Sequence, residues 1–269
     1  MKSAWTSGRR RYVDGLWGQV HLREWGSGRP LFLLHQTPWS GVQFHRLAPL
    51  LAQTGWRVIA PDTPGYGLSD RPSARPAIDD YADNLAVVFD SLDVPDAVIA
   101  GHHTGALIAA AFAASRPART SGLILDNPPF YTFAERAQRV AQRHLAHQPC
   151  EGGEHFTSRW RFLRAMADPG LSVAGVHLAI ISHYVNDASA DHGHAAAYAW
   201  DMSDAVDVIA APTLVLSSRD DEIGAHGSRL LQRRTDWRSA TLPAGPAAAL
   251  ESPELWRDAV LSFLSSQIP

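Results

Sequence analysis

The sequence is short of cysteine, of excess positive charge and of long apolar runs. A single cysteine among 269 residues, Cys150, excludes a disulfide framework and a cysteine-rich zinc site. The 24 basic and 27 acidic residues give a net charge of −3, whereas nucleic-acid binding favours a basic face. No apolar run approaches the roughly 18 residues of a membrane span, and residues 1–15 contain no signal-peptide core. We therefore expect a cytoplasmic protein with neither nucleic acid nor membrane as a partner.

The composition is that of a globular protein, with 45% hydrophobic and 19% charged residues. Short apolar runs alternate with helical patterns, as is typical of parallel strands covered on both faces. The runs lie at 30–34, 57–60, 97–100, 122–125, 213–216 and 240–242, and the helical patterns at 81–92, 106–114 and 254–264. An alternating segment around Asp14 and Gly15 adds a hairpin of residues 12–17 and 20–22. The pattern predicts an α/β fold with a mostly parallel central sheet flanked by helices, and ligands at the carboxyl ends of the strands.

The alternation stops between Asn127 and Asp207. This segment is helical and rich in aromatic residues and histidine, with breaks at 152–153 and 168–170. We predict a core domain of residues 1–126 and 208–269, and a helical cap (lid) of residues 127–207 over the strand ends. The alternative is that these helices only cover a face of the sheet.

The most informative segment is residues 98–106, with the sequence VIAGHHTGA. A strand leads into Gly-x-x-x-Gly and then into an alanine-rich helix, which is the frame of the nucleophile elbow, G-x-S-x-G. Gly101 and Gly105 stand where strand and helix crowd the turn, so only small residues fit there. The middle position, which is usually a serine, is His103.

With this elbow the chain resembles the α/β-hydrolase superfamily, on the branch with epoxide hydrolases, haloalkane dehalogenases and C–C bond hydrolases. The resemblance covers nearly the whole chain. It also rests on the loop 34–38 (LHQTP), the turn 62–70 (DTPGYGLSD), the strand 212–216 (PTLVL) and the segment 245–254. It implies a catalytic acid at Asp221, a catalytic histidine directly after Gly245, and an oxyanion hole made of two backbone N–H groups.

Two of the three triad members that the resemblance implies are missing. The elbow has His103 in place of Ser, Cys or Asp, and the histidine position has Pro246. Proline has neither a titratable group nor an N–H, so Pro246 cannot act as a base. Gln36 replaces the glycine that usually follows His35 in the loop. The triad is degenerate, and we reject a serine-hydrolase mechanism because it needs a hydroxyl nucleophile and a base within reach.

The remaining groups suggest a different site. The resemblance places the N–H groups of Thr37 and Thr104 as oxyanion-hole donors, and Asp221 as a nearby carboxylate. The ring of His103 is long enough to turn into the space of the missing histidine and meet Asp221, which predicts a His–Asp dyad acting as a general base. Asp126 is the backup partner of His103, and Asp220 is the alternative assignment for the acid. The opposing interpretation is a decayed site in which His103 is retained by drift.

Other side chains are expected to shape a pocket or to support the turns. The candidates for substrate binding are Gln36, Phe130, Tyr131, His155, Trp160, His183 and Trp200, with ordinary packing as the alternative for each residue of the cap. His35, Asp62 and His102 are interpreted as structural. Residues 191–194 (DHGH) are interpreted as a solvated loop, and no metal site is predicted.

The leading hypothesis is a bacterial enzyme of specialised metabolism that performs acid–base chemistry on a small, apolar carbonyl compound. Elimination, cyclisation, isomerisation and C–C bond chemistry all pass through an enolate-like anion that the N–H pair would stabilise. The first alternative is hydrolysis of an ester, lactone, epoxide or C–C bond, with His103 as nucleophile or water-activating base and His155 or His183 replacing the missing base. The second is a non-catalytic protein that binds a small molecule. Neither a metal nor an organic cofactor is expected, and the chain is expected to be a monomer or a homodimer.

Overall fold

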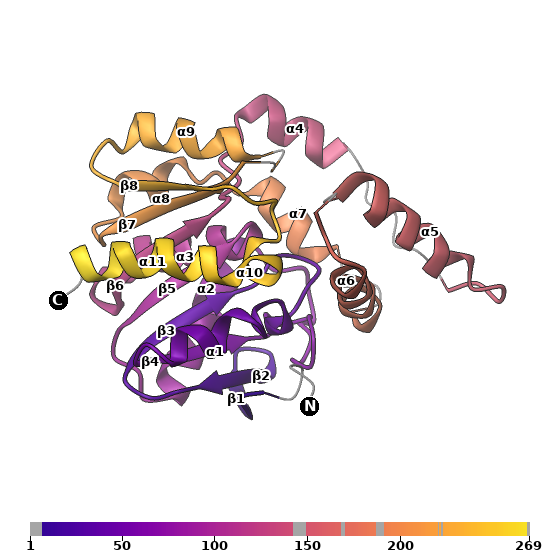
Figure 1. Ribbon diagram of the computed structural model, residues 1–269, viewed down its shortest axis with the longest axis horizontal. Helices are drawn as coiled ribbons and strands as arrows, with labels where there is room; N and C mark the ends of the chain where they lie inside the picture. Colours follow the sequence, from indigo (N-terminus) through magenta and orange to yellow (C-terminus); the bar gives the residue numbers. More distant parts are fainter. Residues whose placement is uncertain are drawn as a thin grey trace.

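The computed structural model describes residues 7–141, 149–167, 170–186, 191–219, 221 and 223–267. An eight-stranded sheet runs through the molecule with helices on both faces (Figure 1). The strand order is β1-β2-β4-β3-β5-β6-β7-β8; the pairs β1–β2 and β2–β4 are antiparallel and the rest are parallel. The strands are β1 (Arg9–Gly15), β2 (Gly18–Trp25), β3 (Arg29–Leu34), β4 (Trp56–Pro61), β5 (Ala97–His102), β6 (Thr120–Asp126), β7 (Thr213–Ser218) and β8 (Arg238–Leu242). The predicted mostly parallel α/β sheet is confirmed.

The N-terminal hairpin is present, but its first strand ends at Gly15 and not at the predicted residue 17. The last pair of the β1–β2 ladder is Gly15 with Gly18, so Leu16 and Trp17 form the turn. Gly18 has a φ of +114°, a conformation that glycine adopts without steric cost. The Asp14-Gly15 pair therefore belongs to the strand end, because Gly18 supplies the positive φ that the turn needs.

Two apolar clusters fix the helices to the sheet. On one face, α1 (Leu47–Ala52), α10 (Ala248–Glu251) and α11 (Pro253–Gln267) pack against the inner side chains of the strands. On the other face lie α2 (Ile78–Ser91), α3 (Thr104–Ser115), α8 (Ser203–Val208) and α9 (Gly224–Arg233). Residues 104–113 of α3 are all buried, which agrees with its apolar sequence on every side. None of the described helices is long and apolar enough to cross a bilayer.

Between β6 and β7 the described chain forms helices only; we call this segment the insertion. Besides α8, it contains α4 (Phe133–Ala141), α5 (Glu154–Phe162), a π-helical turn (Leu163–Ala167), α6 (Val173–Val185) and α7 (His192–Ala199). Short 3-10 turns lie elsewhere at Gly41–Phe44 and Pro117–Arg119. In Figure 1, α4 to α7 gather at one end of the sheet. The predicted break at residues 168–170 has its first two residues outside the described part of the chain.

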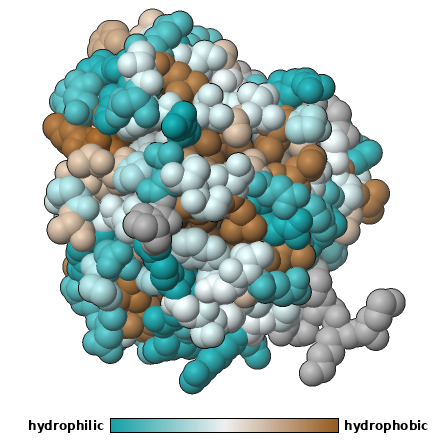
Figure 2. Space-filling view, turned by 60° about the vertical axis from the view of Figure 1, so that its left-hand side comes forward, coloured by the Kyte–Doolittle hydropathy of each residue, from teal (hydrophilic) through white to brown (hydrophobic). Residues whose placement is uncertain are grey.

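Several large apolar side chains of the insertion are exposed, among them Phe133, Val140, Phe156, Phe162, Val173, Ile181 and Val185. On the face shown in Figure 2, hydrophobic side chains form several separate patches among hydrophilic ones. Scattered exposed apolar residues are normal for a globular protein, so these patches alone define no binding surface.

Candidate active site

The elbow has the tight backbone that its glycines predict. His103 joins β5 to α3 with a φ of 48° and a ψ of −114°, an uncommon conformation for a residue with a side chain. A Cβ atom on Gly101 would lie 2.1 Å from the carbonyl oxygen of Gly105, and one on Gly105 would lie 2.2 Å from that of Leu34. Only glycine fits at these two positions, and the turn they permit holds the imidazole at the carboxyl end of β5.

The imidazole of His103 is hydrogen-bonded to the carboxylate of Asp221. Nε2 of His103 and Oδ2 of Asp221 lie 2.7 Å apart, across 118 residues of sequence. The Asp221 side chain is 2% exposed, whereas a quarter of the His103 side chain is accessible. The predicted contact between these two residues is present, and the accessible edge of the imidazole is the part of the pair that a small molecule can reach. Asp220 lies outside the described residues.

The position of the carboxylate determines which ring nitrogen is available. If Nε2–H donates to Asp221, Nδ1 carries the lone pair of the neutral ring. In a Ser-His-Asp triad the carboxylate holds Nδ1 and the base is Nε2, so the roles of the two nitrogens are exchanged here. Nδ1 is the ring nitrogen nearer to the backbone. The candidate base therefore lies close to the start of α3.

Asp221 is placed so that its ionised form is favoured. Burial raises the pKa of this carboxyl, but the charge and hydrogen bond of His103 and the backbone N–H of Ile223 together hold it below the ordinary value. The Ile223 N–H donates to Oδ1 at 3.0 Å. One oxygen is thus fixed by its own turn while the other faces the imidazole.

Thr104 and Thr37 are both buried next to the elbow and the β3 loop. Thr104 is the first residue of α3, and N–H groups in the first turn of a helix have no partner within the helix. Thr37 lies against the insertion, because a Cβ on Gly193 would come within 2.1 Å of its Oγ1. Gly193 belongs to α7 and is buried, so the interpretation of residues 191–194 as a solvated loop is wrong.

The residues interpreted as structural occupy well-defined hydrogen-bond networks. Nε2 of the buried His35 accepts from the Thr63 N–H at 2.9 Å, and its Nδ1 is 2.9 Å from the Gln36 carbonyl. Burial lowers the pKa of His35, in agreement with a neutral ring. The Gln36 N–H donates to Oε1 of Gln43 at 3.2 Å, which fixes the backbone at the position of the replaced glycine. The hydrogen bond thus holds the backbone of Gln36 in the loop, directly before Thr37.

Asp62 orders the turn that follows β4. Its carboxylate accepts hydrogen bonds from the N–H groups of Gly41 (2.7 Å) and Leu68 (2.9 Å), and lies 2.8 Å from Nδ1 of His21. These partners use both oxygens, so the structure places Asp62 in the scaffold of the turn.

Asp126, the backup acid, has other partners. Its Oδ2 accepts from the indole N–H of Trp256 at 2.9 Å, and its Oδ1 from the side-chain amide of Asn127 at 3.0 Å. Nδ1 of the buried His102 approaches Oδ2 to 3.0 Å, but without hydrogen-bond geometry. The ring of His102 is stacked on that of His103, with centroids 4.2 Å apart. The Asp126 carboxylate thus lies beside the ring of His102. Asp221 is the carboxylate that the ring of His103 reaches.

The predicted pocket residues fall into two groups. Phe130 and Tyr131 follow β6, and Tyr131 packs edge-on against Tyr198 (5.8 Å) and His226 (5.0 Å between centroids). Trp200 instead donates its indole N–H to Asp79 of α2 at 3.2 Å. Tyr131 therefore lies beside the helix that follows Asp221, whereas Trp200 attaches the insertion to α2.

The second group lies on α5 and α6. Nδ1 of His155 is 3.3 Å from Sγ of Cys150, and the His155 carbonyl accepts from the Tyr184 hydroxyl at 2.8 Å. His183 packs edge-on against Tyr184, and Trp160 borders the apolar cluster between α6 and the β3 loop. No cluster of three potential metal ligands occurs among the residues that the structure describes.

Pro246 lies in the turn between β8 and α10. The next residue, Ala247, is buried in the same cluster as Trp39 and Val176 of α6. The position of the absent histidine is therefore directly beside the insertion.

His226 was not among the predicted site residues. It lies in the first turn of α9, is 7% exposed, and its Nδ1 has no hydrogen-bond partner in the described part of the chain. Burial and then the charge of Arg229 lower the pKa of His226 to about 4, so the ring is neutral at physiological pH. The only signal in the sequence was its place five residues after Asp221.

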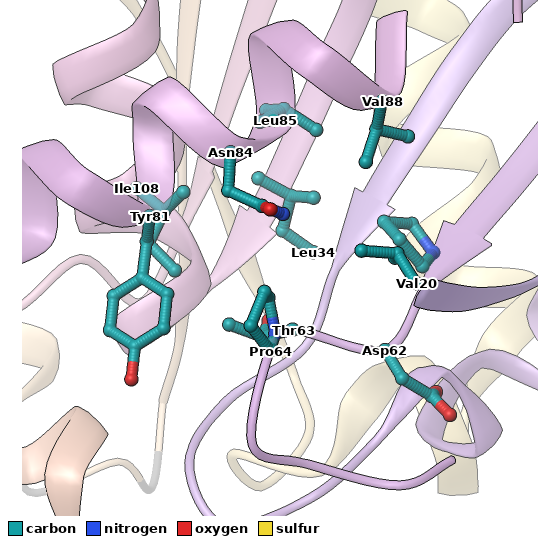
Figure 3. A pocket seen from close by; sticks show the side chains of 11 residues that line it. Val20, Leu34, Asp62, Thr63, Pro64, Tyr81, Asn84, Leu85, Val88 and Ile108 are labelled. Carbon is teal, nitrogen blue, oxygen red and sulfur yellow. The ribbon is translucent and has the colours of Figure 1, made fainter. Parts of the chain in front are cut away.

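A small cavity of about 20 Å³ lies elsewhere, between α2 and the strand ends, and is lined by residues such as Leu34, Tyr81 and Asn84 (Figure 3). This volume holds about one water molecule. The Asp62 carboxylate points away from the other lining side chains in Figure 3. Neither His103 nor Asp221 lines this cavity, so it is not the site described above.

Known proteins share this fold and part of this sequence. Residues 29–147 match the family model described as the alpha/beta hydrolase fold. Haloalkane dehalogenase 2 of Mycobacterium tuberculosis is 30% identical over 143 residues, which are 52% of this chain and 49% of the relative. Bifunctional epoxide hydrolase 2 of Mus musculus is 36% identical over 117 residues, which are 42% of this chain and 21% of the relative. The alignments thus span half or less of these relatives.

Solved structures match almost the whole chain. The E-2-(acetamidomethylene)succinate hydrolase has a TM-score of 0.80 at 21% identity, covering 96% of this chain and all of that one. The enol-lactonase from Burkholderia xenovorans LB400 has a TM-score of 0.76 at 22% identity, covering 95% of this chain and all of that one. These likenesses establish the fold, and the family model adds the sequence relationship. Residues 29–147 therefore match the alpha/beta hydrolase fold family in sequence, and almost the whole chain shares the fold of these solved structures.

Proposed function

We propose that the protein is an enzyme that removes a proton from a carbon next to a carbonyl group, with His103 and Asp221 as the base. The observation that carries this proposal is the 2.7 Å hydrogen bond from Nε2 of His103 to Asp221, at the position where the superfamily mounts its nucleophile. A quarter-exposed imidazole held by a buried carboxylate is a general base with a fixed orientation. A side chain kept at a strained φ of 48° also favours a selected role over drift.

In the proposed step, Nδ1 of His103 forms a bond to the proton while the carbon–hydrogen bond breaks. The electron pair moves to the carbonyl oxygen, which becomes an enolate. The carboxylate of Asp221 stabilises the imidazolium that results, as the buried acid does in a triad. The backbone N–H groups of Thr104 and Thr37 donate to the enolate oxygen, and each such donor is worth about 3 kcal/mol in comparable sites.

Elimination, cyclisation, isomerisation and C–C bond formation can begin with this anion, and C–C bond cleavage forms such an anion when the bond breaks. We propose a small, apolar carbonyl compound as substrate, because Phe130 and Tyr131 offer aromatic surface after β6, and Tyr131 contacts His226, five residues after Asp221. We also propose that residues 127–207 form a cap over this site, since Asn186, directly after α6, is hydrogen-bonded to the β3 loop and to the turn after β4. The proposed step uses groups of the chain alone, with neither metal nor organic cofactor. We also propose a role in specialised metabolism.

Hydrolysis is the second candidate. The similar proteins include a haloalkane dehalogenase, an epoxide hydrolase and an enol-lactonase, which favours a reaction in which water or Nδ1 attacks the substrate. The same base would then take its proton from water, or the imidazole would carry an acyl group for a second step. Both candidates depend on His103, but they differ in the bond that breaks.

Two probes separate the candidates. Exchange of the protons next to the carbonyl of benzylacetone in D2O, followed by NMR, reports proton abstraction, and hydrolysis of p-nitrophenyl butyrate reports acyl transfer. We expect accelerated exchange that falls at least about 100-fold in His103→Ala, because general-base catalysis is typically worth that much or more. His177→Ala, which removes an exposed histidine on α6, is the matched control and should leave the rate unchanged.

The outcome assigns the function. Exchange that depends on His103 supports the proposal, whereas ester hydrolysis that depends on His103, without exchange, supports the second candidate. A folded protein that accelerates neither reaction beyond the His103→Ala variant would contradict both, and would leave a protein that binds a small molecule without converting it.

A further inference from the structure

Asn127 is a buried residue with an uncommon backbone conformation directly after β6. It is 1% exposed and has a φ of 46°. Asparagine tolerates this left-handed region better than most residues with side chains, and glycine tolerates it best. His103, at the end of the neighbouring strand β5, has almost the same φ of 48°. Each of these two adjacent strands is therefore followed by a residue with a positive φ.

The side chain of Asn127 extends the ladder between β6 and β7 by one step. The backbone ladder ends at the pair of Asp126 with Leu216, and the Asn127 N–H still donates to the Leu216 carbonyl at 2.7 Å. Beyond that point the side-chain amide of Asn127, and not the backbone of β6, makes the hydrogen bonds to β7. Its Oδ1 accepts from the Ser218 N–H at 2.7 Å, and its Nδ2 donates to Oγ of Ser218 at 3.1 Å.

Ser218 is where the turn that carries the acid begins. The N–H of Asp221 donates to the Ser218 carbonyl at 3.4 Å, and the Asp221 carbonyl accepts from the Gly224 N–H at 3.0 Å. The position of Ser218 is thus passed on to Asp221 through a single turn. Because the amide of Asn127 holds both the N–H and the hydroxyl of Ser218, it fixes the start of that turn relative to β6.

On its other side, the same dipeptide holds the elbow. The N–H of His103 donates to the carbonyl of Asp126 at 3.0 Å. The Asn127 amide also donates to Oδ1 of Asp126 at 3.0 Å, and the other oxygen is held by Trp256. Residues 126 and 127 therefore bind the backbone of the imidazole residue and the turn of the carboxylate residue at once.

We propose that Asn127 is a positioning residue that sets the distance between His103 and Asp221. The chemistry of the side chain fits this role, because an amide is a donor and an acceptor at the same time. The acceptor is needed for the Ser218 N–H, and the donor for the Ser218 hydroxyl and the Asp126 carboxylate. Aspartate would supply only the acceptor, and would place a second carboxylate against Asp126. The importance of this role for catalysis rests on the proposed function; the geometric part does not.

The test measures the hydrogen bond itself. Proton NMR of the folded protein should show the His103 ring N–H that faces Asp221 as a low-field signal, identified by its loss in His103→Ala. In Asn127→Gly, which keeps the backbone conformation and deletes the amide, we expect this signal to shift upfield or vanish by exchange with water. The kcat of whichever reaction the enzyme catalyses should fall about 10- to 100-fold with little change in KM, as expected for a small misplacement of a reacting group.

The matched control is Asp93→Gly, at an exposed residue with a φ of 52° in the connection between α2 and β5. It makes the same kind of backbone change far from the site and should leave the signal in place. If Asn127→Gly does not fold, Asn127→Asp decides, because it keeps the shape and the acceptor while it replaces the donor by a carboxylate oxygen facing Asp126. A folded variant at position 127 with an unchanged ring signal would overturn the proposal. If the signal responds to position 127 but no reaction is found, the positioning role stands and the proposed function fails.

Discussion

The hydroxyl oxygen of Tyr66 accepts a hydrogen bond of 2.7 Å from the backbone N–H of Gly193. Tyr66 lies in the turn after β4, and Gly193 in the first turn of α7, so this contact joins the core to the insertion. The same hydroxyl is hydrogen-bonded to Thr37, and burial raises the pKa of Tyr66 to about 12. The phenol of Tyr66 therefore connects the insertion to Thr37, the residue whose backbone N–H is one of the two proposed oxyanion-hole donors.

A methyl group at position 193 should disturb this connection. In Gly193→Ala, the new Cβ would lie 2.1 Å from Oγ1 of Thr37 and 2.7 Å from the Tyr66 hydroxyl, so one of these buried groups must move. Overpacking of this kind costs about 1–3 kcal/mol, which urea denaturation can measure. Ala199→Ser, at an exposed position of the same helix, is the control and should change the free energy of unfolding by less than about 0.5 kcal/mol. Equal stability of the two variants would refute the tight contact.

The buried His226 predicts a loss of stability in weak acid. Its pKa is about 4 in the folded protein and ordinarily 6.5, so between these values the unfolded chain binds a proton that the folded chain does not. The free energy of unfolding therefore falls as the pH drops from 6.5 to 4, by between about 1 and 3 kcal/mol from this residue. The charges facing the ring are those of Arg229, Glu135, Arg139 and Asp221.

His226→Gln should remove this contribution while keeping a polar side chain. Unfolding curves in urea at several pH values give the slope of stability against pH for both proteins. The slope of the variant should be smaller between pH 6.5 and 4, although His35, whose pKa is also lowered by burial, leaves part of it. Identical slopes would mean that His226 is protonated as easily in the folded as in the unfolded chain.

The indole of Trp256 should stabilise the fold through Asp126. Both side chains are buried, and Trp256→Phe would leave Oδ2 of Asp126 without this 2.9 Å hydrogen bond. An unsatisfied buried group costs about 1–3 kcal/mol, to which the lost volume of the indole adds. Trp200→Phe removes an indole hydrogen bond of the same chemistry, to the exposed Asp79, and should cost much less. Comparable losses in the two variants would show that burial does not set the value of this contact.

The sequence carried the fold and the two central residues because both depend on local patterns. The apolar runs identified the parallel strands. The two glycines around His103 identified a tight turn, in which no other residue fits at these two glycine positions. The reach of an imidazole was enough to predict the contact with Asp221. The partners of Asp126 could not be predicted, because Trp256 reaches it from α11, 130 residues later. The place of Trp200 beside α2 was equally hidden, since no local pattern tells which surface a helical insertion covers.

The account depends on His103 and Asp221 working as a pair, and Asp221→Asn tests this most directly. The asparagine amide would donate to Nε2 and so force the proton onto Nδ1, which removes the lone pair that accepts a proton from the substrate. In this variant, folded as judged by circular dichroism, we predict that the exchange of benzylacetone protons falls at least about 100-fold, close to the rate of His103→Ala. A rate equal to that of the unaltered protein would contradict the account, because His103 would then act without its carboxylate.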